Sequence, residues 1–136
     1  MEAGDTFLIK DRFGIRHLYV VVSDPQKLPD IRFTEHVFLV MFTSREEHKE
    51  DVCVLKQGEH PSITHDTVIA YKIPPALFES LSVLQKLQDN GIMKQRQPVS
   101  PEILSKIREG YLRSRYKKSD IENFLCRQGV LDWEGH

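Results

Sequence analysis

Residues His36 to Tyr71 read H-V-F-L-V-M-F-T-S-R-E-E-H-K-E-D-V-C-V-L-K-Q-G-E-H-P-S-I-T-H-D-T-V-I-A-Y. The apolar run Val37 to Phe42 is too short to cross a membrane and is rich in β-branched and aromatic side chains, so we expect a buried strand. Two later runs, Val52 to Leu55 and Thr67 to Tyr71, also have strand propensity and are separated by a turn with glycine and proline. The stretch predicts three strands whose ends carry hydroxyl, imidazole and carboxylate groups open to solvent.

Two more strand candidates precede this stretch. They are Thr6 to Lys10 and His17 to Ser23, and a tight turn over Asp11 to Gly14 lies between them. We expect Asp24 to Asp30 to leave the sheet, because its two prolines lack the N–H that a β-ladder needs. About five short strands joined by loops too short for crossover helices predict an antiparallel sheet that curls into a small barrel.

The apolar period changes after Pro74-Pro75. Leucines at helical spacing from Leu77 predict a first helix that ends at Asn90-Gly91, and a polar connector follows over Lys94 to Val99. A second helix is predicted from Ser100-Pro101, where serine caps and proline suits the first position.

A third helix is predicted from Ser119 to Gly129, because Ser119-Asp120-Ile121-Glu122 has a capping-box pattern. The whole pattern is that of one α+β domain, with a barrel in residues 1–75 and a helical extension in residues 76–136. We expect the two or three helices to pack on the barrel or on a second copy of the chain.

Composition narrows the class of protein. The chain has 136 residues and a formal net charge of −1, which suits a single globular domain. Residues 92–118 hold 8 basic and 2 acidic side chains, which predicts either a basic patch or a solvated helix face. Cys53 and Cys126 are expected to be reduced thiols. The acidic N-terminus lacks a signal peptide and no apolar run approaches ~18 residues, so we expect a cytoplasmic protein.

Three motifs together resemble the MazF/PemK family of toxin endoribonucleases, which shares an SH3-like barrel with the gyrase poison CcdB. They are Gly4-Asp5 before the first strand, the strand His17 to Ser23 ending in serine, and the strand Val37 to Phe42 ending in Thr43-Ser44. Asp66-Thr67-Val68 resembles the Asp-Ser-Val that begins a later strand of that family. The resemblance covers roughly residues 4 to 75 and rests on the order and spacing of the motifs.

The resemblance implies a site. In the family an arginine that begins the second strand and a threonine that ends the third are the usual catalytic pair. These positions fall on His17, with Arg16 beside it, and on Thr43. Metal-free RNA cleavage needs a proton acceptor for the 2′-hydroxyl and donors for the phosphorane oxygens. His17 suits proton transfer, and Arg16 suits phosphate binding.

Other side chains complete the predicted chemistry. Thr43 and Ser44 offer hydroxyl donors to the phosphate, while His60 and His65 are further proton carriers that Asp66 could orient. Each of these residues also has a structural interpretation as a backbone contact, a surface charge or a turn former. A zinc site of Cys53, His60, His65 and Cys126 fits no standard ligand spacing, and we expect no metal or cofactor.

The resemblance implies a metal-independent endoribonuclease that cleaves single-stranded RNA through a 2′,3′-cyclic phosphate, acts as a homodimer and is inhibited by an antitoxin. The loop Asp11 to Ile15 is shorter than in the family, and no proline follows Arg16 or His17. These departures favour a second hypothesis, a non-catalytic SH3-like module that binds protein or nucleic acid. A third is a CcdB-like topoisomerase inhibitor acting through its C-terminal helical surface.

Overall fold

The computed structural model describes residues 1–28 and 31–128. Seven strands come first along these residues, and a helix, an eighth strand and two further helices follow, which is an α+β arrangement. They are β1 (Thr6–Lys10), β2 (Arg16–Val21), β3 (Gln26–Leu28), β4 (Ile31–Ser44), β5 (Val54–Leu55), β6 (Thr67–Ala70), β7 (Leu77–Ser80), α1 (Leu81–Asp89), β8 (Met93–Arg96), α2 (Pro101–Arg113) and α3 (Ser119–Arg127).

Strand β4 is the centre of the sheet. It pairs along one edge with β2 and β3 and along the other with β6 and β7, always antiparallel. Tyr19 lies opposite Met41, and Met41 lies opposite Ala70, so β2, β4 and β6 form three neighbouring strands at this level. β1 then joins β2 to β8, and β5 joins the free edge of β6.

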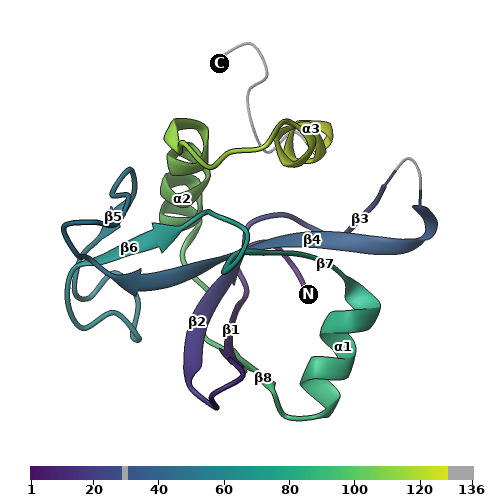
Figure 1. Cartoon of the computed structure of the whole chain (residues 1–136), viewed down its shortest axis with the longest axis horizontal. Coiled ribbons are helices and arrows are strands. Elements are labelled where there is room, and N and C mark those ends of the chain that lie inside the picture. Colours follow the sequence, from purple (N-terminus) through teal and green to yellow (C-terminus); the bar gives the residue numbers. More distant parts are fainter. Residues whose placement is uncertain (29–30, 129–136) are drawn as a thin grey trace.

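The sheet has two ends. Among the described residues its path runs β5-β6-β4-β2-β1-β8, and no ladder joins β5 to β8. In Figure 1, β1, β2 and β8 lie below β4, which runs across the molecule, so the sheet bends at the β2–β4 contact. The predicted antiparallel α+β class is confirmed, and the described pairings leave the sheet open.

Each face of the sheet packs on its own core. On one face Leu18, Val20, Phe38, Val40 and Phe42 pack against α2 and α3; we call this the helical face. On the other, Tyr19, Val37, Leu39 and Met41 pack with α1; we call this the groove face. The helices lie above and below the sheet in Figure 1. Successive side chains of β4 alternate between the cores, as expected of a strand covered on both sides.

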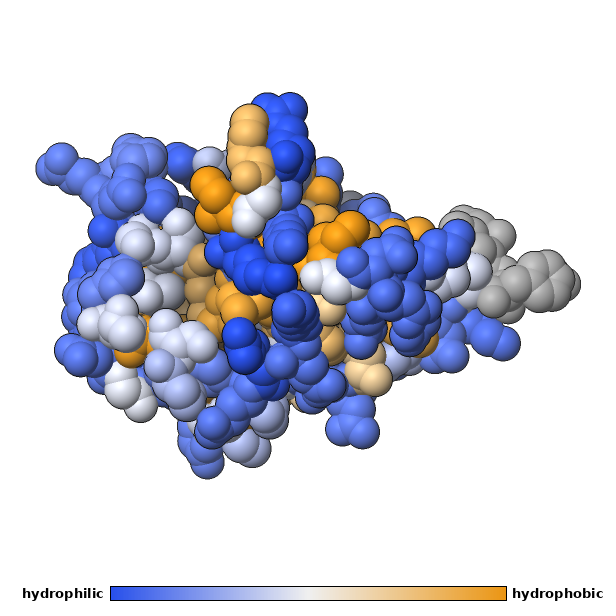
Figure 2. Space-filling model, turned by 90° about the horizontal axis from the view of Figure 1, so that it is seen from below, coloured by the Kyte–Doolittle hydropathy of each residue, from blue (hydrophilic) through white to orange (hydrophobic). Residues whose placement is uncertain are grey.

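The two faces are not covered equally. The groove face has a single short helix, α1, of which Leu84 is the buried residue. Figure 2 looks at the molecule from that side and shows apolar surface in the middle of the view, with hydrophilic residues around it. Among the described residues, the large hydrophobic side chains that stay exposed are Phe13 and Ile15 in the β1–β2 turn and Val83 on α1.

Three strands were missed in the sequence. Gln26–Leu28 was predicted to lie outside the sheet, yet it pairs with β4 because the two prolines flank this segment and leave its N–H groups intact. Leu77–Ser80 was predicted as the start of a helix but pairs with β4 through Leu77 and Leu39. Met93–Arg96 overlaps the predicted connector and is an edge strand on β1, with Met93 buried and the next three residues exposed.

The helix starts follow the capping rules in two cases of three. Ser100 accepts a hydrogen bond from the Ile103 N–H at 3.2 Å, and Pro101 occupies the first turn, as predicted. Ser80 caps α1, which therefore begins four residues later than predicted. The capping box at Ser119 was wrong, since Lys118 is the N-cap residue and its side chain makes no capping bond. The predicted stop at Gly129 lies outside the described residues.

Other expectations concern turns and surfaces. Gly14 has φ +80° and its N–H bonds to the Asp11 carbonyl at 3.0 Å, which confirms the tight turn. Tyr19, Phe42 and Tyr71 are buried, in agreement with a core role. Cys53 and Cys126 are not joined in a disulfide, as predicted. No helix in the described residues is long and apolar enough to span a bilayer.

Candidate active site

His17 lies near the start of β2, beside the turn that joins it to β1. Its Nε2 is 3.0 Å from Asp11 Oδ2, and both side chains are about one-third exposed, at 36% and 31%. The other Asp11 oxygen accepts from the backbone N–H groups of Phe13 and Ile15, so the turn itself holds the carboxylate. The hydrogen bond from His17 keeps the pKa of Asp11 below its usual value, and the two backbone bonds act in the same direction.

Asp11 sets the proton position on the His17 ring. Because a carboxylate only accepts, Nε2 carries the hydrogen and the lone pair is on Nδ1 in the neutral ring. Within the described residues Nδ1 has no hydrogen-bond partner. His17 can therefore take a proton at Nδ1 while Asp11 stabilises the resulting imidazolium.

Thr43 lies near the end of β4 and is bound by a lysine that the sequence did not single out. The Lys49 ammonium donates to Thr43 Oγ1 at 2.6 Å and to the Ser44 carbonyl at 3.1 Å. Its side chain is 26% exposed, which is low for a lysine, and Glu46 lies 3.5 Å from the ammonium. The loop after β4 thus folds back so that a cation touches the threonine hydroxyl.

His17 and Thr43 belong to the same face of the sheet. Ile9 is the partner of His17 on β1, and Ile9 and Tyr19 both pack in the groove-face core. Thr43 is two residues beyond Met41, which packs against that core. Since residues two apart on a strand share a face, both side chains lie on the groove face, past the last paired residues of β2 and β4.

A solvent-open groove of about 290 Å³ adjoins this position. Met41, Thr43 and Val68 line its sheet side, while Lys49, Lys72 and Arg115 bring positive charge to it. His17 is not among the lining residues. The strand that carries it nevertheless reaches the groove, because the Tyr19 hydroxyl donates to the carbonyl of the lining residue Pro75 at 2.9 Å. Burial of that hydroxyl raises the pKa of Tyr19.

Arg16 and Ser44 lie on the helical face. Each is one residue away from a groove-face position, and Leu18 and Phe42 mark their side of the sheet. Ser44 Oγ is 2.7 Å from His65 Nε2, and Thr64 Oγ1 is 3.1 Å from Nδ1. Ser44, Thr43 and His65 border a separate shallow depression of about 140 Å³. The hydroxyls of the predicted pair therefore differ in their partners: Thr43 Oγ1 is bound by Lys49, and Ser44 Oγ contacts His65.

His60 is part of the packing. It is 3% exposed, its Nε2 is 2.6 Å from the Gln97 carbonyl, and its Nδ1 accepts from the Ser62 N–H at 3.1 Å. Phe42 meets its ring edge-to-face. Both ring nitrogens are thus engaged with the backbone, and the structural interpretation of this histidine is the one that its contacts favour.

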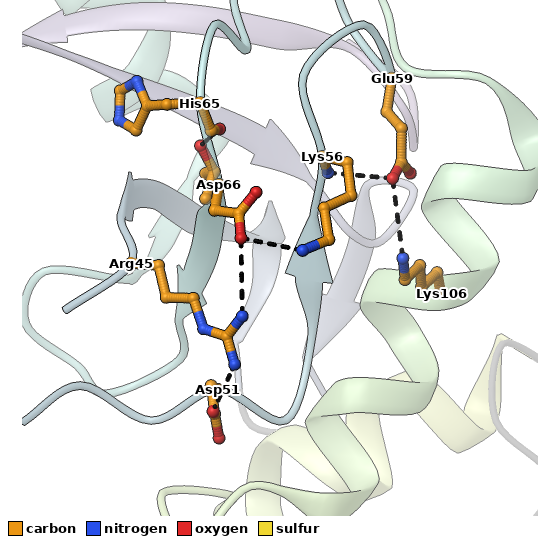
Figure 3. Close-up of polar contacts among 8 residues, drawn as sticks. Arg45, Asp51, Lys56, Glu59, His65, Asp66 and Lys106 are labelled. Carbon is orange, nitrogen blue, oxygen red and sulfur yellow. Dashed lines mark hydrogen bonds and ion pairs between the residues drawn. The ribbon is translucent and has the colours of Figure 1, made fainter. Parts of the chain in front are cut away.

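Asp66 binds cations instead of orienting an imidazole. Its carboxylate is 2.8 Å from Lys56 Nζ and 3.6 Å from Arg45 Nη1, and Arg45 also reaches Asp51 at 3.2 Å. Figure 3 shows the carboxylate between these two cations while the His65 ring points away from it. The hydrogen bond from Lys56 is the main cause that lowers the pKa of Asp66. Asp66 helps to hold the strand ends and the loop together.

The predicted basic patch is dispersed over the structure. Arg108 donates from Nε and Nη2 to the Val22 carbonyl, and Arg113 donates to the Val52 carbonyl. Lys106 and Lys117 lie near Glu59 and Glu122, respectively. Arg115 is the member of the segment that lines the groove. Arg108, Arg113 and Lys106 thus tie α2 to the sheet and its loops.

The three lysine and arginine residues that line the groove were not predicted as site residues. Lys49 comes from a loop of mixed charge, whereas Lys72 and Arg115 are far apart in the chain. No spacing signal could have grouped them, because the fold of the loop and of the α2–α3 turn brings them together. Among the described residues, no three His, Cys, Asp or Glu side chains gather in a metal-binding arrangement.

Compared with protein-family models, curated proteins and solved structures, the chain matches none of them.

Proposed function

We propose that this chain is a MazF/PemK-like toxin: a cytoplasmic endoribonuclease that cleaves single-stranded RNA without a metal ion. One observation carries the proposal. An imidazole paired with a carboxylate, His17–Asp11, occupies the same face of the sheet as a hydroxyl paired with an ammonium, Thr43–Lys49, and the second pair lines a groove open to solvent. A proton acceptor and donors for a charged phosphorane are the groups that RNA cleavage requires.

The proposed reaction begins at the ribose. Nδ1 of His17 takes the proton of the 2′-hydroxyl, and the 2′-oxygen attacks the adjacent phosphorus. The bond from phosphorus to the 5′-oxygen then breaks, the leaving oxygen takes a proton from water, and a 2′,3′-cyclic phosphate remains. DNA lacks the attacking hydroxyl, so the substrate is RNA.

Thr43 and Lys49 stabilise the charge of the transition state in this proposal. The ammonium donates to Oγ1, which leaves the threonine proton to point at a phosphate oxygen. Lys49 also supplies the cation that the family places at the start of the second strand, where this chain has His17. Arg16 lies on the helical face, so its charge is on the opposite side from Thr43.

The resemblance extends the proposal to fold and partners. Strand β4 pairs with four other strands, and the sheet bends at β4. This arrangement is consistent with an SH3-like barrel in which the end strands β5 and β8 are not paired with each other. A homodimer and an inhibitory antitoxin belong to the same proposal.

The test is cleavage of a long single-stranded RNA in the presence of EDTA. We expect fragments that end in a cyclic phosphate, and a loss of roughly a hundredfold to ten-thousandfold in rate for His17→Ala, in keeping with general base catalysis. Thr43→Val removes the hydroxyl but keeps the shape, and Lys49→Met removes the charge but keeps the length. Each should cost roughly a hundredfold or more, as for loss of an oxyanion donor.

Matched controls lie on the other face. His65→Ala and Ser44→Ala remove an imidazole and a hydroxyl that contact each other away from Lys49, and they should leave the rate nearly unchanged. Equal losses in both sets, or RNA that stays intact, would contradict the proposed site.

The second candidate is a binding module without catalysis. It is favoured by the division of the predicted residues, since Arg16 and Ser44 do not join His17 and Thr43. Tight RNA binding without cleavage in the same assay would select it.

A further inference from the structure

The groove has a second wall, to which the C-terminal extension contributes two residues. Lys72 follows β6, and Arg115 and Tyr116 lie in the turn between α2 and α3. The Arg115 Cζ is 4.9 Å from the centroid of the Tyr116 ring, and the Lys72 Nζ is 5.8 Å from it. Both cations are exposed, so their heads reach water while the half-buried ring holds them in place.

The backbone of this wall is tied to the loop that carries Lys49. The Glu50 carboxylate accepts from Ser114 Oγ at 2.6 Å and from the Arg115 N–H at 2.9 Å. Ser114 is 3% exposed, so the bond lies at the edge of the helical-face core. These bonds fix Arg115 relative to Lys49 and engage the negative charge of Glu50, the acidic residue that lines the groove.

We propose that Lys72 and Arg115, held against Tyr116, bind a phosphate of the RNA strand next to the phosphate that is cleaved. This inference rests on the proposed function and assigns a substrate-binding role to the C-terminal extension. The groove presents Lys49, Lys72 and Arg115 against one carboxylate, which complements a polyanion. The planar guanidinium suits two phosphate oxygens, and the ammonium adds a point charge.

Binding can be measured separately from cleavage. A labelled single-stranded RNA with 2′-O-methyl groups throughout cannot be cut by attack of the 2′-oxygen, and its affinity follows from fluorescence anisotropy over a range of salt concentrations. For Lys72→Ala combined with Arg115→Ala we expect an affinity about tenfold weaker. The slope of log affinity against log salt should become less negative by about 0.7, the change for one lost phosphate contact on a single strand.

The control removes the same two charges elsewhere. Lys94→Ala combined with Arg96→Ala changes exposed residues of β8, which is separated from β4 by β1 and β2. This variant should keep the wild-type affinity and slope. Tyr116→Phe should also bind normally, whereas Tyr116→Leu loses the ring that places the cations and should bind several-fold more weakly.

The outcomes separate this inference from the proposed reaction. Selective weakening in the Lys72 and Arg115 variant supports the subsite even if the wild-type protein leaves natural RNA intact. Equal weakening by both double variants, no weakening, or no binding by the wild type overturns the subsite. If cleavage depends on His17 but the Lys72 and Arg115 double variant binds RNA normally, the proposed reaction is supported and this inference is refuted.

Discussion

The two faces of the sheet differ in how they are covered. Two helices bury the helical face, where Ile107, Phe124 and Leu125 are fully enclosed, whereas one short helix covers part of the groove face. The polar groups differ accordingly. On the helical side the Tyr71 hydroxyl donates to the Ile107 carbonyl, and its burial raises its pKa above the usual value. On the groove side His17, Thr43 and Lys49 remain partly exposed. Packing of the helices on one face stabilises the sheet, so polar side chains on the other face can stay exposed to solvent.

The largest expected effect is on the helical face. Phe124 is fully buried on α3 and meets Phe78 edge-to-face with centroids 5.0 Å apart. Phe124→Ala should lower the free energy of unfolding by about 3–5 kcal/mol, because it leaves a cavity and loses buried area. Urea denaturation measures the change. The exposed neighbour Asn123→Ala should stay within about 0.5 kcal/mol of the wild type.

The matching change on the groove face is Leu84→Ala. Leu84 is the fully buried residue of α1. We expect Leu84→Ala to lower the free energy of unfolding by about 2–4 kcal/mol, less than Phe124→Ala, because a partly open face can relax around the missing side chain. Val83→Ala, on the same helix and 41% exposed, is the control. If Leu84→Ala destabilised the protein more than Phe124→Ala, the contrast between the faces would be incorrect.

A smaller loss is expected from Gly110→Ala in the middle of α2. A Cβ at this position would overlap the Tyr71 hydroxyl and would lie 2.8 Å from the Cys53 Cβ. The resulting shift should cost about 1–3 kcal/mol, even though alanine favours a helix more than glycine does. Glu109→Ala, exposed one residue earlier, tests the helix without the close contact. A stabilised Gly110→Ala would show that α2 can move away from the sheet.

The smallest effect is electrostatic and is local to the groove face. His17→Ala removes the main cause of the lowered Asp11 pKa, so that pKa should rise toward 3.8. The Asp11 contribution to stability is present above about pH 3.8 and is lost as the pH falls through the lower folded value. Carbon NMR of the carboxyl group reports the titration directly. The pKa of Asp66, lowered by Lys56, should not change, and a common shift of both groups would argue against a local pair.

Much of the fold could be predicted because the signals were local. Strands near Thr6–Lys10 and Val37–Phe42, and the start of α2 at Ser100, follow from β-branched content and from capping. The segments Leu77–Ser80 and Met93–Arg96 could not be predicted in the same way. Their pairing with β4 and β1 is tertiary, and leucine at position 77 fits a helical period as well as a strand.

The candidate site was also predictable only in part, because some of its contacts are tertiary. His17 and Thr43 share a face because of strand alternation, which the sequence contains, and Ser44 is excluded from that face by the same rule. The partners Asp11 and Lys49 depend on how a turn and a loop fold back on the strands. Arg115 and Lys72 are brought together only after the helices pack.

The central position of β4 has a consequence for biosynthesis. During translation its 36–39 segment has no neighbour on one edge until residue 80 has left the ribosome, and β1 lacks one neighbour until residue 96 has done so. A nascent chain of 75 residues would therefore display unpaired backbone edges that invite association with other chains. Residues 1–75 therefore need the extension to complete the pairing of β4 and β1, so we expect the two parts to fold only when they are made as one chain.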